Sequence, residues 1–139
     1  MADLDKLRKI KEKLNKGLPS IGTWVQIPNA ISAEILSSSD LFEWVCIDFE
    51  HSSISIETCE SLIRSIEGAG SIPIVRLTSN NSDLIKRVMD SGALGIIVPM
   101  VCDYNSILEA SNAMHFPPRG TRSVGLARAQ GWGKNFQKY

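Results

Sequence analysis

Four short runs of β-branched and apolar residues recur along the chain, and each is followed by a segment whose apolar residues return at three- and four-residue steps. The predicted strands start about 22 to 28 residues apart, which is the length of a βα unit with short loops. Near-continuous apolar strands are typical of a parallel sheet covered by helices. The sequence therefore predicts an α/β fold with strands at 20–27, 43–48, 71–77 and 94–100.

The helical segments have recognisable ends. The segment after the third strand has a start signal at Asn81 and a stop signal at Gly92. The charged run "KLRKIKEKLNK" near the N-terminus is typical of a helix with one solvated face. The expected organisation is one domain over 1–139, with an N-terminal helix (1–17), four βα units (18–114), and a loop and tail (115–139).

Composition argues against several classes of partner. Lys plus Arg equals Asp plus Glu, 15 against 15, so no net field draws the chain to nucleic acid or an anionic membrane. The longest apolar stretch, "LGIIVPMV", is far shorter than the roughly 20 residues that span a bilayer. The 3 cysteines have no CxxC spacing and fit reduced thiols, with Cys46 and Cys102 expected to be buried beside apolar runs. We expect a soluble, cytoplasmic protein.

Polar and aromatic side chains stand at the ends of the predicted strands, where parallel α/β folds build their sites. Asp48 ends an apolar strand in "EWVCIDFEH" and is expected to have a partner, because an unpaired buried carboxylate is costly. A histidine beside a carboxylate is a usable general base near pH 7, and arginine suits carboxylate or enolate oxygens. The strand-end residues are Trp24, Gln26, Asp48, Glu50, His51, Arg76, Pro99 and Met100.

Each of these residues alone has a plainer interpretation. Asp48 is equally consistent with a loop or helix cap, His51 with a hydrogen-bonded structural histidine, and Arg76 with a simple ion pair to Asp48. Trp24 could belong to the core. Asp90 lies in the last turn of a predicted helix, where the helix dipole disfavours a negative charge, which hints at function or reflects a tolerated exposed residue. The combination at adjacent strand ends favours a site.

Six motifs give the chain a family resemblance. "GTWVQ", "IDFEH", "PIVRL", "LIKRVMDSGA", "IIVPMV" and "FPPRGTRSVGLARA" stand in the order and spacing of the HpcH/HpaI aldolases. The chain resembles this family from about Lys16 to its C-terminus. The resemblance implies a (β/α)₈ TIM barrel, of which this chain supplies about the first four βα units, and assembly as homo-hexamers. It also implies cleavage of 4-hydroxy-2-oxo acids, such as 4-hydroxy-2-oxoheptanedioate, to pyruvate and an aldehyde.

The resemblance also implies roles for individual residues. His51 matches the general base that removes the proton of the 4-hydroxyl group, through a water. Arg76 matches the arginine that binds the pyruvyl oxygens and stabilises the enolate, and Asp90 matches an aspartate that raises the basicity of the histidine. The loop "PPRGTRSVG" resembles one that lies near the site of a neighbouring subunit. The remaining pocket residues are Trp24, Asp48 and Glu50.

The expected cofactor of the full-length family is a divalent metal, Mg²⁺, Mn²⁺ or Co²⁺. No lysine stands at a predicted strand end, so a Schiff base is disfavoured and metal stabilisation of the enolate is the remaining route. Family members are longer, and their metal ligands, a Glu and an Asp on later strands, have no counterpart in this sequence. The "GPADLS"-type segment that holds the pyruvate carboxylate is also missing.

Four βα units would leave two open parallel edges. We therefore expect the chain to be the N-terminal half of a longer protein; the alternatives are two copies that close a barrel together and a flattened open sandwich. The leading functional hypothesis is a metal-dependent aldolase whose activity in this chain alone stays open. The second is a catalytically silent half barrel that serves as an interaction module. A receiver-like domain is disfavoured, because "VQIPNA" offers no acidic pair after the first strand.

Overall fold

A four-stranded parallel sheet forms the centre of the computed structural model, which describes residues 4–139. The strand order along the sheet follows the order in the chain, so each strand pairs with the next one in sequence. Each crossover contains a helix, as parallel pairing requires. The α/β prediction is confirmed. The strands are β1 (Gly22–Val25), β2 (Trp44–Asp48), β3 (Ile72–Arg76) and β4 (Gly95–Ile97).

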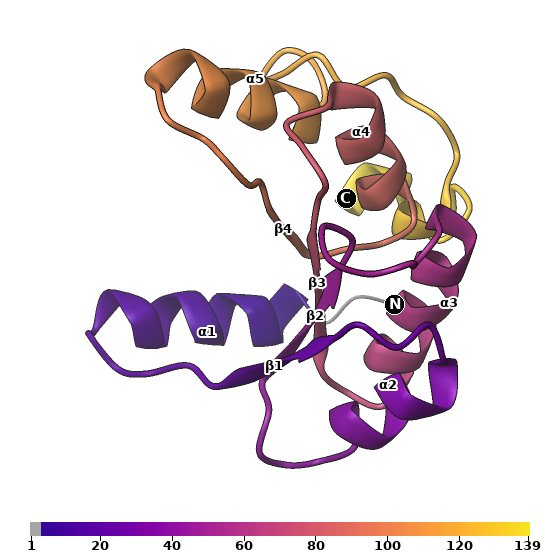
Figure 1. Cartoon of the computed structure of the whole chain (residues 1–139). Coiled ribbons are helices and arrows are strands. Elements are labelled where there is room, and N and C mark those ends of the chain that lie inside the picture. The colour runs from indigo at the N-terminus through magenta and orange to yellow at the C-terminus, as the bar shows by residue number, and fades with distance from the viewer. Residues whose placement is uncertain (1–3) are drawn as a thin grey trace.

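Helices α2, α3 and α4 lie on one side of the sheet, and α1 projects from the other side (Figure 1). Two short 3₁₀ turns, η1 and η2, follow the last α-helix. The helices are α1 (Leu4–Asn15), α2 (Ala30–Ser37), α3 (Ile56–Gly68), α4 (Ser82–Asp90) and α5 (Tyr104–Met114), and the turns are η1 (Arg128–Gln130) and η2 (Phe136–Lys138). No helix of the described part is long and apolar enough to cross a membrane.

The hydrophobic core lies between the sheet and the helices on its covered side. Ile47 of β2 is the register partner of Val25 on β1 and of Val75 on β3, so these three side chains face the same way. They pack in one buried cluster with apolar residues of α3, including Leu62 and Ile66. Alternate residues of the same strands therefore face the other side, where no helix of the α2–α4 layer covers them.

Side-chain caps fix where the helices begin. Asn81 accepts a hydrogen bond from the backbone N–H of Leu84 at the start of α4, as its position in the sequence predicts. Asp103 does the same for Ser106 at the start of α5. The chain leaves α4 through Gly92, whose φ of 103° is one that other residues rarely adopt.

Some expectations about local structure were wrong. The fourth strand ends at Ile97 instead of continuing to residue 100; Pro99 has no N–H for a sheet hydrogen bond, and Met100 has a φ of 55°. The three cysteines are free thiols, but Cys102 is exposed because it lies in the loop after that shortened strand. Burial is confirmed for Cys46.

The C-terminal segment, predicted as a loop and tail, packs against the outer helices. Arg122 pairs with Asp90 at the end of α4, and Arg128 pairs with Glu67 at the end of α3. The buried side chain of Gln130 accepts a hydrogen bond from the backbone N–H of Ala127 and closes the turn around η1. Residues 115–139 therefore belong to the layer on the covered side of the sheet.

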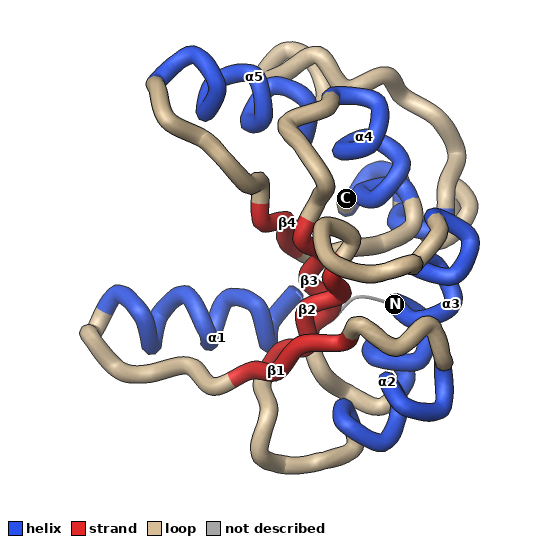
Figure 2. Tube along the Cα trace, in the orientation of Figure 1, coloured by secondary structure: helices blue, strands red, loops and turns tan. Residues whose placement is uncertain are grey.

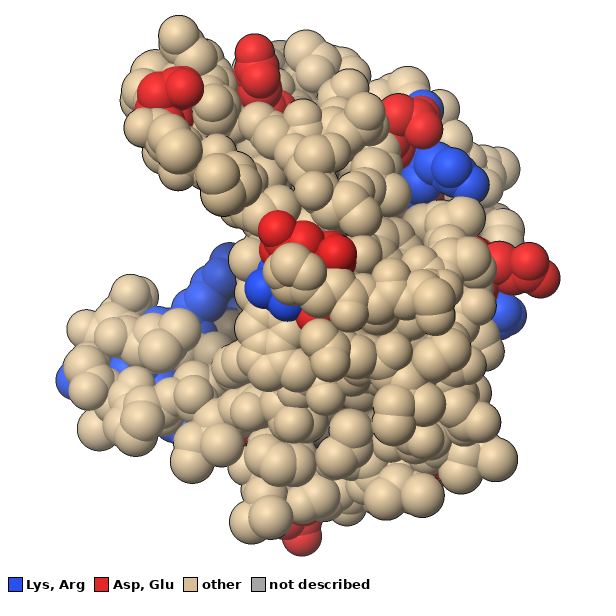
Figure 3. All heavy atoms as spheres, viewed as in Figure 1, with Lys and Arg blue, Asp and Glu red and all other residues tan. Residues whose placement is uncertain are grey.

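The two outer strands, β1 and β4, each have one neighbour in the described part of the chain, so the sheet has two open edges (Figure 2). The surface is hollowed on the α1 side, between α1 and the region of α5 (Figure 3). The four parallel strands, each followed by a helix, agree with the half of an eight-stranded barrel that the family resemblance implies, and one face of this half barrel is uncovered.

Candidate active site

An ion pair joins the carboxyl ends of β2 and β3. Asp48 and Arg76 are register partners, so their side chains leave the sheet side by side on the same face. Arg76 donates from Nε to Asp48 Oδ1 at 2.9 Å and from Nη2 to Asp48 Oδ2 at 2.7 Å. This two-point contact fixes the plane of the guanidinium group. Asp48 is fully buried, whereas the Arg76 side chain remains 24% exposed.

Asp48 also receives three further hydrogen bonds. Gln26, just beyond β1, donates its Nε2 to Asp48 Oδ2 at 2.8 Å. The backbone N–H groups of Glu50 and His51 donate to Asp48 Oδ1 at 3.1 and 3.2 Å. The hydrogen bonds from Arg76 are the main reason that the pKa of Asp48 is far below its ordinary value, outweighing the loss of water on burial. The carboxylate therefore keeps its charge inside the fold.

Two more side chains surround the guanidinium group of Arg76. The ring of Trp24 lies under it, with 4.7 Å from the ring centroid to Cζ. Glu50 Oε2 lies 3.4 Å from Nε. Within the described part of the chain, the Nη1 group of Arg76 donates to no protein atom. It is the part of the guanidinium that a bound oxyanion could use.

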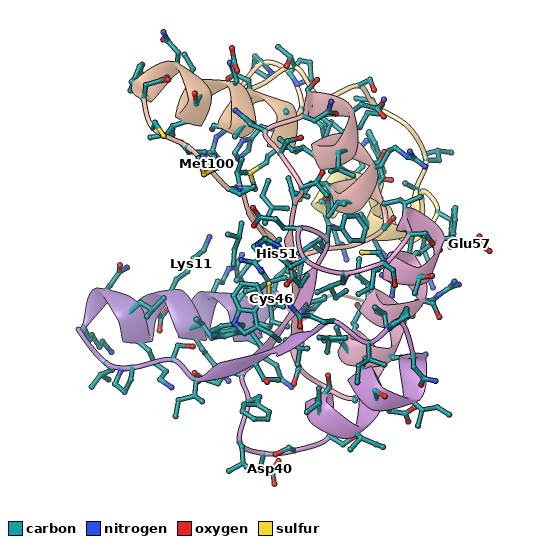
Figure 4. All side chains as sticks on the ribbon, in the orientation of Figure 1. Lys11, Asp40, Cys46, His51, Glu57 and Met100 are labelled. Atoms are coloured by element: carbon teal, nitrogen blue, oxygen red, sulfur yellow. The ribbon has the colours of Figure 1, made fainter. Side chains whose placement is uncertain are left out.

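His51 follows directly on the same loop. Its Nε2 lies 3.8 Å from Glu50 Oε2, and its side chain is 63% exposed. The turn that presents it exists because Asp48 accepts from the backbone of residues 50 and 51 and because Ser52 Oγ donates to the carbonyl of Asp48. Figure 4 shows His51 at the open side of the sheet, with Met100 farther toward α5.

The cluster combines a fixed cation, two carboxylates and an accessible imidazole. Arg76 compensates the negative charge of Asp48, and Glu50 lies beside the same guanidinium group. An incoming oxyanion would contact the free edge of Arg76, and the imidazole could take up or release a proton next to it. This arrangement suits reactions that develop negative charge on an oxygen while a neighbouring hydroxyl loses a proton.

These residues do not make a metal site. Among residues 4–139, no group of three or more His, Cys, Asp or Glu side chains could hold a metal ion. Both oxygens of Asp48 are occupied by Arg76, Gln26 and backbone N–H groups. A hard divalent cation wants about six oxygen ligands, and one partly committed Glu50 does not supply them. No step of the chemistry is therefore assigned to a metal held by these residues.

The structure brings together five of the six candidate residues: Trp24, Asp48, Glu50, His51 and Arg76. Asp90 is the exception. It ends α4, whose C-terminus lies at the opposite end of the sheet, where the chain is about to enter β4. There its Oδ1 pairs with Arg122. A direct contact between Asp90 and His51 of the same chain is not compatible with this topology.

The sequence placed Gln26 at a strand end but assigned it no role in the site, and the structure shows that it binds Asp48. Its place just after the first strand put it at the correct end of the sheet. The sequence does not indicate which group the Gln26 side chain binds, because its hydrogen bond to Asp48 depends on the register between β1 and β2. Of the other strand-end residues, Pro99 and Met100 belong to the loop after β4, and Met100 is exposed.

The site is an open surface. A hollow of about 520 Å³ lies elsewhere, where the C-terminal segment meets the ends of α3 and α4, and is lined by Glu67, Arg128 and Trp132 among others. The Asp48–Arg76 cluster instead faces the uncovered side of the half barrel. We identify this cluster as the candidate site from the geometry and charge of its side chains, although it does not lie in an enclosed pocket.

Comparison with known proteins identifies the family. Residues 20–135 match the HpcH/HpaI aldolase/citrate lyase family. The chain belongs to this family. It is 36% identical over 126 residues to the 4-hydroxy-2-oxo-heptane-1,7-dioate aldolase of Salmonella dublin, covering 89% of this chain and 48% of that protein. It is 34% identical over 122 residues to the hydroxypyruvate/pyruvate aldolase of Agrobacterium fabrum, covering 88% and 46%.

Solved structures agree with this assignment. An HpcH/HpaI family protein from Burkholderia cenocepacia superposes with a TM-score of 0.78 at 30% identity, covering 83% of this chain and 47% of that one. The citrate synthase SbnG gives 0.75 at 38% identity, covering 82% and 46%. An HpcH/HpaI aldolase from Desulfitobacterium hafniense, at 24% identity and a TM-score of 0.79, supports the fold alone. The chain thus spans about half the length of the relatives it matches.

Proposed function

We propose that this HpcH/HpaI chain contributes the oxyanion-binding and proton-transfer side of a carbon–carbon lyase site that cleaves 4-hydroxy-2-oxo acids to pyruvate and an aldehyde. The observation behind this proposal is the Arg76 guanidinium, fixed by Asp48 and Trp24 with one edge left for a ligand. Curated relatives that cover most of this chain are named as aldolases acting on related acids.

In this proposal, Arg76 binds an oxygen of the 2-oxo acid and stabilises the enolate that forms when the carbon–carbon bond breaks. His51 accepts the proton of the 4-hydroxyl group, through a water, so that the carbon–carbon bond breaks and the oxygen becomes that of the aldehyde. His51 then returns the proton to the methyl carbon of the enolate, which gives pyruvate. Glu50 contacts both groups and positions the imidazole. Asp48 contributes by holding Arg76, and it remains ionised throughout.

The family resemblance implies a divalent metal. This metal remains a proposal, because the residues of the cluster described above do not supply its ligands. When bound, such an ion would supply positive charge to the enolate oxygen. Expectations of a hexamer and of a cytoplasmic location likewise rest on the resemblance.

The proposal is tested by exchange of the methyl protons of pyruvate in heavy water, followed by NMR with and without added Mg²⁺ or Mn²⁺. Enolisation would replace these protons with deuterium. We expect exchange with the wild-type chain and a loss of about 100-fold or more in His51→Ala. His115→Ala is the matched control, because His115 uses its Nδ1 on the carbonyl of Ser111 at the end of α5.

Equal exchange in His51→Ala and the wild type would remove His51 from the role of base. No exchange by the wild-type chain under either condition would favour the second candidate, a silent half barrel.

A further inference from the structure

Gln26, Asp48 and Arg76 form one row across three neighbouring strands. Asp48 and Arg76 are register partners on β2 and β3. Gln26 directly follows Val25, the last residue of β1, and so stands opposite Asp48. Trp24 points to the same face of the sheet, because side chains alternate along a strand, and its ring lies under the guanidinium group of Arg76. The end of β1 therefore contacts both members of the ion pair.

The hydrogen bonds of Asp48 are divided between its two oxygens. Oδ1 accepts from Arg76 Nε at 2.9 Å and from the backbone N–H groups of Glu50 and His51. Oδ2 accepts from Arg76 Nη2 at 2.7 Å and from Gln26 Nε2 at 2.8 Å. Among the described residues, Gln26 is the only group besides Arg76 that binds Oδ2. Without Gln26, the turn after β2 still fixes Oδ1, but Oδ2 and the guanidinium group can shift together.

The direction of the Gln26 amide follows from the charge of its partner. Asp48 is ionised, because the hydrogen bonds from Arg76 hold its pKa far below the ordinary value. An ionised carboxylate only accepts hydrogen bonds, so the amide must present its nitrogen to Oδ2. A glutamate at this position would have the same shape but would bring two acceptors together. The contact therefore depends on a donor at residue 26 and not only on the space that the side chain fills.

We propose that Gln26 is a positioning residue of the site, which fixes the Asp48 carboxylate and thereby sets the direction in which Arg76 presents its free edge to a ligand. The effect on ligand binding rests on the proposed function, whereas the effect on Arg76 itself does not. Every contact involved belongs to β1, β2, β3 and the turn after β2. This role is therefore the same whatever covers the open side of the sheet.

Two variants separate this role from simple filling of space. Gln26→Ala removes the hydrogen bond at every pH. Gln26→Glu removes it only while the new carboxyl group is ionised, because a protonated carboxyl group again offers a donor to Asp48 Oδ2. The neighbouring carboxylate raises the pKa of that group above the ordinary glutamate value of about 4.3. Gln26→Glu should therefore be impaired at about pH 7 and recover towards about pH 5, whereas Gln26→Ala should not recover.

Other groups near Asp48 also carry charge or titrate. They are Arg76, Glu50, His51 and the buried Cys46. All of them are present in the wild type and in both variants, so comparing the proteins at the same pH removes their contributions. Gln137→Glu is the matched control, because it makes the same substitution at an exposed glutamine in η2.

The test measures how fast the Nε–H proton of Arg76 exchanges with water, by NMR of the ¹⁵N-labelled chain at about pH 5 and about pH 7. Rates are expressed relative to free arginine at the same pH, and Arg76→Ala identifies the signal. We expect exchange about 10-fold faster than in the wild type for Gln26→Ala at both pH values and for Gln26→Glu at the higher pH. Gln26→Glu at the lower pH and Gln137→Glu should stay within about twofold of the wild type. Recovery of one protein by pH alone excludes misfolding as the cause.

The same samples are titrated with pyruvate, and the dissociation constant should rise by about 10-fold wherever exchange is faster. Unchanged exchange in Gln26→Ala, or no recovery of Gln26→Glu at the lower pH, would overturn the proposal. Faster exchange with an unchanged dissociation constant would also overturn it, because Arg76 would then bind its ligand without help from Gln26. A wild type that does not bind pyruvate would count against the proposed function, and the exchange rates alone would then decide whether Gln26 positions Arg76.

Discussion

At the scale of single residues, Asp48 explains why an apolar strand ends in a charged group. Its carboxylate is fully buried but exchanges water for five hydrogen bonds, two from Arg76, one from Gln26 and two from backbone N–H groups. In return it fixes Arg76 and shapes the turn that presents His51. One residue therefore serves both stability and the geometry of the site, and the plainer interpretation of Asp48 as a cap for the loop is also correct.

The pH dependence of stability follows from this residue. The hydrogen bonds from Arg76 lower the pKa of Asp48 in the folded chain. In the unfolded chain the pKa of an Asp side chain is about 3.9. Its contribution is fully present above that pH and is lost as the pH falls below it. We expect Asp48→Asn to reduce the free energy of unfolding by about 1.5–3 kcal/mol at pH 7.

Urea unfolding at several pH values measures this effect. Below about pH 4 the difference between wild type and Asp48→Asn should shrink by up to about 1.4 kcal/mol per pH unit. Comparing the two proteins cancels the titration of the other carboxylates. Asp40→Asn, at an exposed loop position, is the control and should show little difference at any pH. A difference as large at pH 3 as at pH 7 would contradict the assigned cause.

At the scale of elements, the C-terminal segment is held by a buried cation. The Arg122 side chain is 1% exposed, contacts the rings of Phe116 and Tyr139, and pairs with Asp90. This contact accounts for a negative charge in the last turn of α4, where the helix dipole alone disfavours it. Asp90 thus has a structural role in the chain, separate from the role beside His51 that the family resemblance implies.

Removing the charge of Asp90 should therefore loosen the segment. Asp90→Asn leaves Arg122 buried without its counter-charge, and we expect a loss of about 3 kcal/mol in the free energy of unfolding. Hydrogen exchange should rise in residues 115–139 before it rises in the sheet. Asp83→Asn on the same helix is the control, since Asp83 is exposed and its ion pair with Lys86 is a surface pair. Equal stability of Asp90→Asn and Asp83→Asn would show that the pair with Arg122 contributes little.

At the scale of the whole molecule, local patterns predicted the order of elements and long-range contacts completed the fold. Asn81 and Gly92 marked the ends of α4 because caps and stops act within a few residues. The packing of the C-terminal segment was not predictable in this way. Arg122 and Arg128 meet partners 32 and 61 positions away, and nothing in the surrounding sequence specifies them.

The contacts of the candidate site likewise include some that the sequence predicts and some that depend on long-range packing. The pairing of Asp48 with Arg76 was predictable, because adjacent parallel strands end at the same edge and a buried carboxylate needs a partner. The contribution of Gln26 required the β1–β2 register, and the displacement of Asp90 required the direction of α4. What lies opposite the site depends on how the open side of the half barrel is covered, which is a property of an assembly rather than of the local sequence.

Binding of a 2-oxo acid by Arg76, as held by Asp48 and Trp24, can be measured by titrating pyruvate against ¹⁵N-labelled chain and following the arginine Nε–H signals by NMR. We predict a saturable shift of the Arg76 signal in the wild type and in Arg64→Ala, whose altered arginine is exposed on α3. The chemical-shift changes that pyruvate causes at backbone N–H groups near residue 76 should be lost in Arg76→Ala. Absence of saturable binding by the wild type, or unchanged binding by Arg76→Ala, would show that Arg76 does not bind the 2-oxo acid.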